Sequence, residues 1–253
     1  MGTDADADIS RTDDDARIGD YGLDARRVVV WLGFGAFGAG MVMLFAAVAH
    51  APGWLTLGAF GACVVLGLAA LVLTWSSRVG KLRERVRLVE WLDLRADAYV
   101  LDAGCGSGLV LVEAAKRTPL GLSVGIEQWR AVPNVPSVAE VVLENADAEG
   151  VDDNVVVTNS SMTRLPFADD TFDVVTSCFV LHRIGSRAAR LDAIREAARV
   201  LVPGGRLVVL DSAKTKQVVA AMRSVDLAGV TRSRRILRLI PAARYVTGSK
   251  PSR

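Results

Sequence analysis

Charge is what this sequence most lacks: of its 253 residues, the 50 from Val28 to Ser77 include no Asp, Glu, Lys or Arg. Globular chains carry about one charged residue in four. Cysteine is scarce as well, and its three copies, Cys63, Cys105 and Cys178, are too few and too scattered for a small disulfide scaffold. Hydrophobic residues nevertheless make up 51% of the chain, which excludes intrinsic disorder throughout.

The uncharged stretch predicts two transmembrane helices, roughly Val28–Ala49 and Leu55–Trp75. Each has about 20 residues, enough to cross a hydrocarbon core, and a Pro-Gly pair breaks the run between them. Two buried helices of a soluble protein are the alternative, and the lack of a charged face on either helix argues against it. We therefore expect residues 28–76 to contact a lipid bilayer as a hairpin.

Basic residues indicate the orientation of this hairpin. Arg26 and Arg27 precede it, its turn has none, and five follow it: Arg78, Lys81, Arg83, Arg85 and Arg87. The positive-inside rule then predicts a multi-pass protein of the cell membrane, with its N-terminus and the following domain in the cytoplasm. The basic run also has helical spacing, so it can lie on the anionic inner leaflet, begin the soluble domain, or do both.

Small residues recur four apart in the predicted spans, as in Gly35 with Ala39 and Gly58 with Ala62. This spacing lets helix backbones approach closely, either within the hairpin or between two copies in a homodimer. Apart from His50, no ionisable side chain lies in or between the spans, whereas transport pathways usually show intramembrane charge. We interpret the hairpin as an anchor.

The hairpin divides the chain into three parts, 1–25, 26–77 and 78–253. The first is expected to be a disordered acidic tail, because residues 1–27 hold eight Asp and four Arg and show no apolar period. Its early acidic residues do not fit a secretory signal. The third part holds 26 Lys and Arg against 20 Asp and Glu without an aromatic ladder, so we expect no nucleic-acid partner.

Within residues 78–253, short strand-like runs alternate with helical patterns. Ser137 and Glu140 form a capping box for one helix, Ser186 can cap another, and Pro203 with two glycines ends it. The basic segment Arg232–Arg238 is expected to form an edge strand. The other expected strands are Ala98–Leu101, Ser123–Ile126, Val155–Thr158, Val174–Cys178 and Leu207–Leu210. This alternation predicts an α/β fold with a mostly parallel sheet covered on both faces, whose ligand binds at the carboxyl ends of the strands.

The strongest functional signal is the glycine-rich loop after the first of these strands. Asp102 precedes Gly104, Gly106 and Gly108, and the next strand ends in Glu127. Glycines at this spacing let the backbone turn tightly and let a ligand approach it. An acid at the end of the second strand can accept hydrogen bonds from both hydroxyls of a ribose. The pattern therefore predicts a nucleoside-containing ligand.

A dinucleotide, and with it an oxidoreductase, is one candidate. The sequence fingerprint of a dinucleotide site needs a glycine three residues after its middle glycine. Here the middle glycine is Gly106, and Leu109 stands three residues later. Asp102 lies close to the loop, and an acid there suits a cation better than a pyrophosphate. S-adenosylmethionine carries an amine and a sulfonium and has no phosphate, so it fits the loop better.

Four ordered motifs together resemble a known family. They are Leu101–Gly108, Gly125–Glu127, Leu165–Val175 (LPFADDTFDVV) and Arg199–Leu207 (RVLVPGGRL). Residues 80–250 resemble a class I S-adenosylmethionine-dependent methyltransferase of the small-molecule type, in particular bacterial members with a membrane hairpin before this domain. The resemblance implies a Rossmann-like, mostly parallel seven-stranded sheet with helices on both faces, and S-adenosyl-L-methionine as cofactor.

The resemblance also implies where the cofactor binds. Asp102 and the glycine loop would surround its methionine end, Glu127 would hold the ribose, and Ser161 stands where the family usually has an Asp for the adenine amino group. Trp129 either flanks the adenine, roofs the substrate or packs against the protein. The expected cofactor-binding residues are Asp102, Gly104, Cys105, Gly106, Gly108, Glu127, Gln128, Ser161, Met162 and Cys178.

The sequence indicates catalytic residues less clearly than cofactor-binding ones. Methyl transfer from a sulfonium needs the two reactants held close and collinear, and it needs a base only where the acceptor loses a proton. His182 is the candidate base, with a structural histidine as the alternative, and Arg183 departs from the Asn that the subgroup commonly has. Asp211 ends a strand either at the same rim or at the surface. We expect no metal ion in this site.

The sequence therefore predicts a membrane-anchored methyltransferase that acts on a small-molecule acceptor on the cytoplasmic side. The anchor favours a lipophilic acceptor, such as a quinone or an isoprenoid-like compound. Ser161 and Arg183 stand where the family has other residues. They motivate an alternative, a non-catalytic S-adenosylmethionine-binding or scaffold module tethered to the membrane.

Overall fold

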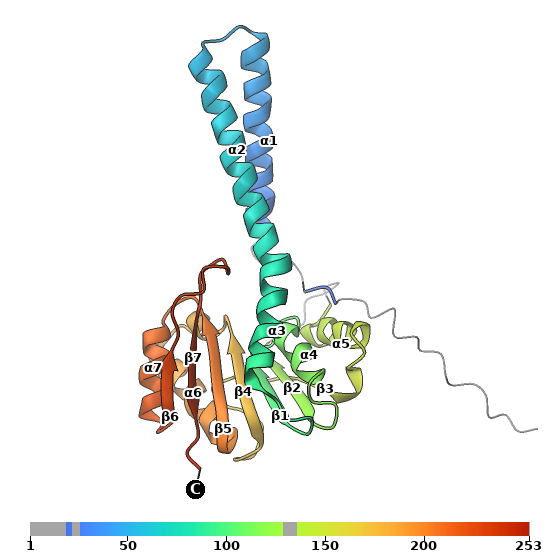
Figure 1. Cartoon of the computed structure of the whole chain (residues 1–253), viewed down its shortest axis with the longest axis vertical. Helices are drawn as coiled ribbons and strands as arrows, with labels where there is room; N and C mark the ends of the chain where they lie inside the picture. The colour runs from blue at the N-terminus through green and yellow to red at the C-terminus, as the bar shows by residue number, and fades with distance from the viewer. Residues whose placement is uncertain (1–18, 22–25, 129–135, 253) are drawn as a thin grey trace, which may run out of the picture.

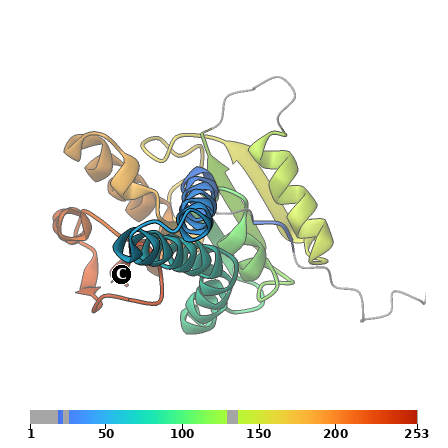
Figure 2. The same ribbon diagram turned by 90° about the horizontal axis from the view of Figure 1, so that it is seen from above.

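A computed structural model describes residues 19–21, 26–128 and 136–252 (Figure 1). Two long helices, α1 (Arg26–Val48) and α2 (Gly53–Trp75), form an antiparallel hairpin that stands on an α/β domain. Seen from above, the hairpin lies over the middle of that domain (Figure 2). Most of the expected acidic tail, and Trp129, lie outside the described residues.

The hairpin has the bounds that the apolar pattern predicts, to within two residues. Its helices pack on each other, and their large outward side chains, among them Trp31, Phe45 and Leu57, stay exposed. Two of the small residues face the partner helix: a Cβ on Gly35 would lie 3.2 Å from Leu66, and one on Gly40 would lie 3.7 Å from the Cys63 sulfur. Within the described residues the two helices are therefore not buried in a protein core.

Helix α2 runs into the domain without a break. A π-helical turn, η1 (Ser76–Gly80), joins it to α3 (Lys81–Leu92), and Gly80 keeps helical dihedral angles of −59° and −47°. Leu88 and Leu92 of α3 are buried against the sheet. The basic run therefore forms the first helix of the domain, and its contact with the inner leaflet stays a prediction.

The described residues contain one sheet of seven strands in the order β3-β2-β1-β4-β5-β7-β6. The first five strands in this order are parallel, and β7 is antiparallel to both of its neighbours, so the sheet is mixed. The strands are β1 (Tyr99–Ala103), β2 (Leu122–Glu127), β3 (Val155–Asn159), β4 (Phe172–Cys178), β5 (Leu201–Asp211), β6 (Ala228–Arg232) and β7 (Arg244–Ser249).

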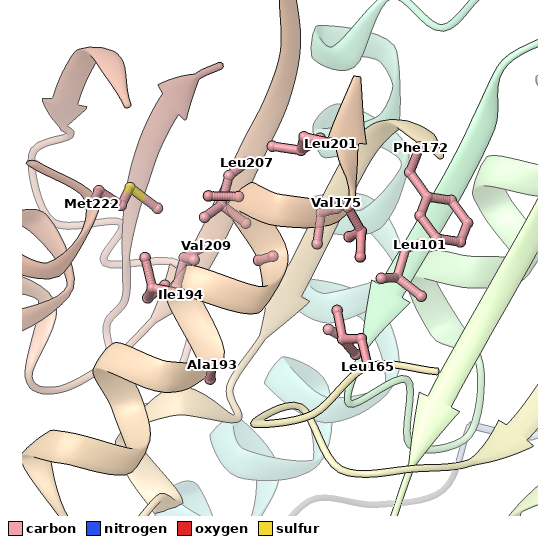
Figure 3. Packing of buried hydrophobic residues seen from close by; sticks show 14 of the residues in the cluster. Leu101, Leu165, Phe172, Val175, Ala193, Ile194, Leu201, Leu207, Val209 and Met222 are labelled. Carbon is pink, nitrogen blue, oxygen red and sulfur yellow. The ribbon is translucent and has the colours of Figure 1, made fainter. Parts of the chain in front are cut away.

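Helices cover both faces of this sheet, as expected from the alternating pattern. Neighbouring residues point to opposite faces: Val100 packs in the cluster beneath α3, whereas Leu101 joins Val209 and Ile194 of α6 on the other side (Figure 3). Helices α3, α4 (Leu109–Ala115) and α5 (Val138–Ala148) lie on one face, and α6 (Arg187–Val200) and α7 (Thr215–Ser224) on the other. Two short helices, η2 (Asp152–Asn154) and η3 (Leu181–Arg183), complete the domain.

The predicted caps at the starts of helices α5 and α6 are confirmed. The Ser137 hydroxyl accepts a hydrogen bond from the Glu140 N–H, and the Glu140 carboxylate accepts one from the Ser137 N–H. Ser186 likewise caps α6. Helix α6 ends at Val200, and Leu201 is the first residue of β5.

The expected edge strand Arg232–Arg238 is wrong. Strand β6 ends at Arg232, and the chain then forms a loop that reaches the base of the hairpin, where the Ile240 N–H donates to the Ser76 Oγ. Arg238, which lies in this loop, donates two hydrogen bonds to buried Glu84 of α3. This tertiary ion pair directs the chain away from the sheet edge, and sequence periodicity does not report it.

Candidate functional site

The loop between β1 and α4 is shaped by three glycines in the left-handed region. Gly104, Gly106 and Gly108 have φ of 85°, 52° and 83°, which other residues rarely adopt. A Cβ on Gly104 would lie 2.4 Å from a methyl group of Val180, so the loop is packed there. Beside Gly106 a Cβ would meet nothing within 4 Å. The loop therefore offers an open backbone face at its centre.

The carboxylate of Glu127 lies against this open part of the loop. Its Oε2 accepts a hydrogen bond of 3.2 Å from the Gly106 N–H, and its Oε1 accepts one of 3.2 Å from the Gln128 N–H. Strand β2 is hydrogen-bonded to β1 in parallel register, which places Glu127 beside the loop that follows β1. The two sequence signals, the loop and the second acid, thus meet at one point.

Asp102 sits beneath the loop as a buried acid. The Thr176 hydroxyl of β4 donates a 2.7 Å hydrogen bond to its Oδ1. Burial raises the pKa of Asp102 to about 7, and the negative charge of Glu127 adds to the rise although the Thr176 bond opposes it. A cation placed beside Asp102 would stabilise its ionised form, so the position favours a positively charged ligand group.

A cavity of about 290 Å³ opens in front of these residues. Asp102, Glu127 and Cys178 line it from the strand ends, together with the glycine loop. Burial raises the pKa of the Cys178 thiol, which keeps it protonated. The opposite wall comes from α3 and the loop before β7, through Lys81, Glu84, Arg85, Leu88 and Leu239.

A second cavity, of about 450 Å³, lies next to the first, and Gly104, Glu127 and Arg183 line both. Its other walls include Gln128, Ser161 and Met162, three of the expected cofactor-binding residues, of which Ser161 was expected at the adenine. The Ser161 hydroxyl is within 2.8 Å of the Thr163 hydroxyl. The paired cavities form one elongated site with Glu127 between its halves, which suits a ligand with a polar chain, a ribose and a flat base.

His182 lies near this site but is turned toward Asp211. Its Nδ1 is 2.6 Å from Asp211 Oδ1, and its backbone N–H donates a 2.9 Å bond to Oδ2 of the same carboxylate. Asp211 is fully buried, so the surface position considered for it is wrong. Of the two cavities, neither is lined by His182. Its role as a base therefore stays a prediction.

Two residues of the first cavity escaped sequence reasoning. Tyr21 comes from the expected acidic tail, yet its hydroxyl donates a 2.5 Å bond to Glu149, and the Arg85 guanidinium lies 4.8 Å from its ring centre. Tyr21 is the lone aromatic residue among the first 25, which was the available signal. The sequence predicts Lys81 only as a member of the basic run after the hairpin, and burial lowers its pKa to about 8.

The site contains no arrangement suited to a metal ion within the part of the chain that the structure describes. There, no group of three or more His, Cys, Asp or Glu side chains is placed to hold a metal.

Comparison with known proteins bears on what that ligand is. Residues 101–209 match a family model described as a methyltransferase domain. The chain is 36% identical over 128 residues to 27-O-demethylrifamycin SV methyltransferase of Amycolatopsis mediterranei, which covers 49% of this chain and 42% of the relative. It is 34% identical over 125 residues to the ubiquinone/menaquinone biosynthesis C-methyltransferase UbiE of Dinoroseobacter shibae, with coverage of 49% and 46%.

The solved structures agree on the fold. The YcgJ protein of Bacillus subtilis superposes with a TM-score of 0.54 at 17% identity, covering 68% of this chain and 100% of that one. The matches to the curated relatives span less than half of their length. The residues matched by the family model fall on the α/β part of the chain.

Proposed function

Because residues 101–209 match a family model described as a methyltransferase domain, we propose that this chain is a class I S-adenosylmethionine-dependent methyltransferase. It transfers a methyl group from that cofactor to a lipophilic small molecule at the cytoplasmic face of a membrane. The observation that carries the proposal is the convergence of buried Asp102, the open face of Gly106 and the Glu127 carboxylate on one elongated site. Relatives named as methyltransferases of rifamycin and quinone compounds support a small-molecule acceptor.

The residues present fit the cofactor group by group. Asp102 offers a buried carboxylate to its ammonium and sulfonium charges, since an unlike charge nearby favours the ionised acid. Glu127 offers two acceptor oxygens to the ribose hydroxyls, in exchange for the backbone N–H groups that they now accept from. Gln128, Ser161 and Met162 line the half of the site left for the adenine.

The protein's contribution to methyl transfer is positional. The cofactor supplies a methyl group on a positively charged sulfur, and the reaction is an in-line displacement. Holding the two reactants in one cavity and in line removes most of the entropic cost of their encounter. The cavity walls opposite the glycine loop, Lys81, Leu88 and Leu239, are placed to hold the acceptor.

A membrane position and a lipophilic acceptor are supported by the path of the backbone. Lys81 lies six residues beyond the end of α2 on a continuous helix, which at 1.5 Å per residue is about 9 Å. The acceptor wall of the cavity is therefore close to the end of the apolar hairpin. A molecule dissolved in the bilayer can reach the site without crossing a long stretch of water. The basic residues on both sides of the hairpin favour the cytoplasmic side.

A non-catalytic module is the second candidate, and Ser161 and Arg183 favour it because they depart from the family pattern. The two candidates differ in turnover. We would incubate the full chain in lipid nanodiscs with cofactor carrying a radiolabelled methyl group. One set of discs would contain an isoprenoid-tailed hydroquinone, and another would receive the same hydroquinone without its tail. The Glu127→Ala variant serves as the control.

The proposal predicts label in the tailed acceptor, at least tenfold less in the tailless one, and none with Glu127→Ala. Equal labelling of the two hydroquinones would contradict the proposal of a lipophilic acceptor, whereas the proposed methyltransferase activity would stand. No labelling of any acceptor by a folded, cofactor-binding chain would favour the non-catalytic module.

A further inference from the structure

We propose that the loop from Ser233 to Ala243, which joins β6 to β7, is a second membrane contact that docks in the headgroup layer of an anionic bilayer. The inference rests on the proposed membrane anchoring and goes beyond it, since the anchor alone needs no such loop. The interfacial loop, as we call these eleven residues, lies on the same end of the domain as the hairpin (Figure 1).

Direct contacts hold the interfacial loop at the base of the hairpin. The Ile240 N–H donates a 3.1 Å hydrogen bond to the hydroxyl of Ser76, the first residue after α2. The carbonyl oxygen of Arg238 lies 3.3 Å from the point where a side chain on Gly80 would begin. A membrane that contains α2 up to Trp75 would therefore have its headgroups at the level of this loop.

The interfacial loop has an inner and an outer apolar face. Leu239 and Ala243 are buried against Leu210 in a small core of their own. Leu237 is 78% exposed and Ile240 is 41% exposed, although both are large aliphatic side chains. Their exposure beside the hairpin, rather than elsewhere on the domain, continues the apolar surface of α2 into the region below it. Lipid is the occupant that covers both surfaces at once.

The charges of the interfacial loop and its flanks are all of one sign. No Asp or Glu follows Asp226, whereas arginines occupy 232, 234, 235, 238 and 244. Arg238 is paired with Glu84, but Arg234 and Arg235 are exposed. Burial and the neighbouring charges of Arg232 and Arg235 lower the pKa of Arg244, which is a sign of crowded positive charge. Anionic headgroups would relieve this repulsion.

The loop also takes part in the site. Leu239 lines the first cavity, while Leu237, two residues away, faces outward. One short segment therefore has bilayer on one side and the acceptor wall on the other. Docking of the interfacial loop would hold this wall at the depth where a bilayer-dissolved acceptor presents its polar head.

Photocrosslinking of the full chain in nanodiscs tests the proposal. The photoreactive residue p-benzoylphenylalanine replaces one side chain at a time: Leu237 in the interfacial loop, Phe45 in α1, or Leu120. Leu120 is the matched control because it is 79% exposed and its N–H bonds to Ala96, beyond the far end of α3. Discs contain phosphatidylcholine alone or an equal mixture with phosphatidylglycerol, and mass spectrometry detects lipid adducts.

We expect lipid adducts at positions 45 and 237 and at most a tenth of that yield at 120. Phosphatidylglycerol should raise the yield at 237 severalfold. The double change Arg234→Gln and Arg235→Gln should abolish that rise, whereas Arg187→Gln with Arg195→Gln on α6 should leave it. Adducts at 45 but none at 237 would overturn the interfacial loop and leave the anchor intact. Adducts at neither position would overturn the anchor and the loop together. Crosslinks from position 237 to a second protein chain, without lipid adducts there, would overturn the membrane contact of the interfacial loop alone.

Discussion

The carboxylate of Glu127 accepts a 3.2 Å hydrogen bond from the backbone N–H of Gly106, so the last residue of β2 touches the centre of the glycine loop after β1. The two residues are 21 apart in the chain, and the parallel pairing of β1 with β2 brings them together. A ribose that took up this carboxylate would be held against an open backbone.

Replacing Asp102 by Asn should stabilise the fold and weaken cofactor binding. The ordinary pKa of 3.8 is raised to about 7 by burial, so as pH rises from about 4 to 7 the unfolded chain loses a proton that the folded chain keeps. Stability is lost over this window. An Asn avoids the loss. Since one pKa unit corresponds to about 1.4 kcal/mol, we expect Asp102→Asn to unfold a few degrees higher at pH 8.

The same variant should bind S-adenosylmethionine at least tenfold more weakly, because the positive groups of the cofactor would no longer face the Asp102 carboxylate. Thermal unfolding at pH 4 and pH 8, with a titration of the cofactor, checks both effects. A variant that is less stable at pH 8, or that binds as tightly as the wild type, would contradict the role given to Asp102.

Alanine at Gly104 and at Gly106 should act differently. At Gly104 the new Cβ would lie 2.4 Å from Val180, and φ is 85°, so we expect a loss of about 1–3 kcal/mol in the free energy of unfolding. At Gly106 the Cβ has open space and φ is 52°, which costs about 1–2 kcal/mol. Gly106→Ala should instead lose cofactor binding, because its Cβ projects from the face that the ligand approaches.

Chemical denaturation and cofactor titration of both variants separate the two effects. If Gly106→Ala bound the cofactor normally while folded, the open face of the loop would not be the binding surface.

Ser161→Asp should strengthen the binding of the adenine group of S-adenosylmethionine. A carboxylate accepts a stronger hydrogen bond from an amino group than a neutral hydroxyl does. We expect affinity for S-adenosylmethionine to rise up to about tenfold. S-inosylmethionine, which has an oxygen in place of that amino group, should show no gain. A gain for both ligands would mean that the added charge acts at long range rather than on the adenine.

The contacts of Glu149 should make the fold sensitive to acid. Burial alone would raise its pKa, but bonds from Lys116 and Tyr21 and the charge of Arg85 lower it to about 2. The ionised form therefore stabilises the fold above pH 4.5, and this contribution is lost as pH falls from 4.5 through 2. Glu149→Gln removes one of the two carboxylates that pair with buried Arg85, the other being Glu113, and should cost about 3 kcal/mol at pH 7.

Denaturation of the wild type and Glu149→Gln between pH 7 and pH 3 gives the measurement. The gap between the two stabilities should narrow below pH 4.5. A gap that stays constant with pH would show that the carboxylate is not ionised in the way that its contacts indicate.

Local signals carried most of the prediction of this fold. The two apolar helices, the Ser137 capping box and the loop with Gly104 and Gly106 depend on neighbours within a few residues, so the sequence reports them directly. Glu127 was reached because a parallel sheet brings successive strand ends to one edge. The order of the strands and the antiparallel β7 depend on distant pairings, which single-sequence patterns do not encode.

The parts that escaped prediction depend on tertiary contacts. Tyr21 reaches the cavity through Glu149, which lies 128 residues away. Lys81 lines the site because α3 continues α2, and the absence of any proline between Trp75 and Lys81 was the one sequence sign of that continuity. The segment Arg232–Arg238 alternates like a strand in sequence, and periodicity does not report the ion pair between Arg238 and Glu84 of α3 that is found in the structure.

Calorimetric titration of the full chain in nanodiscs with S-adenosylmethionine, beside NAD and with Glu127→Ala as the control, tests the central claim most directly. The account predicts micromolar binding of S-adenosylmethionine, at least a hundredfold weaker binding by Glu127→Ala, and none of NAD. A folded chain that binds NAD in preference, or whose affinity for S-adenosylmethionine survives the loss of the Glu127 carboxylate, would contradict it.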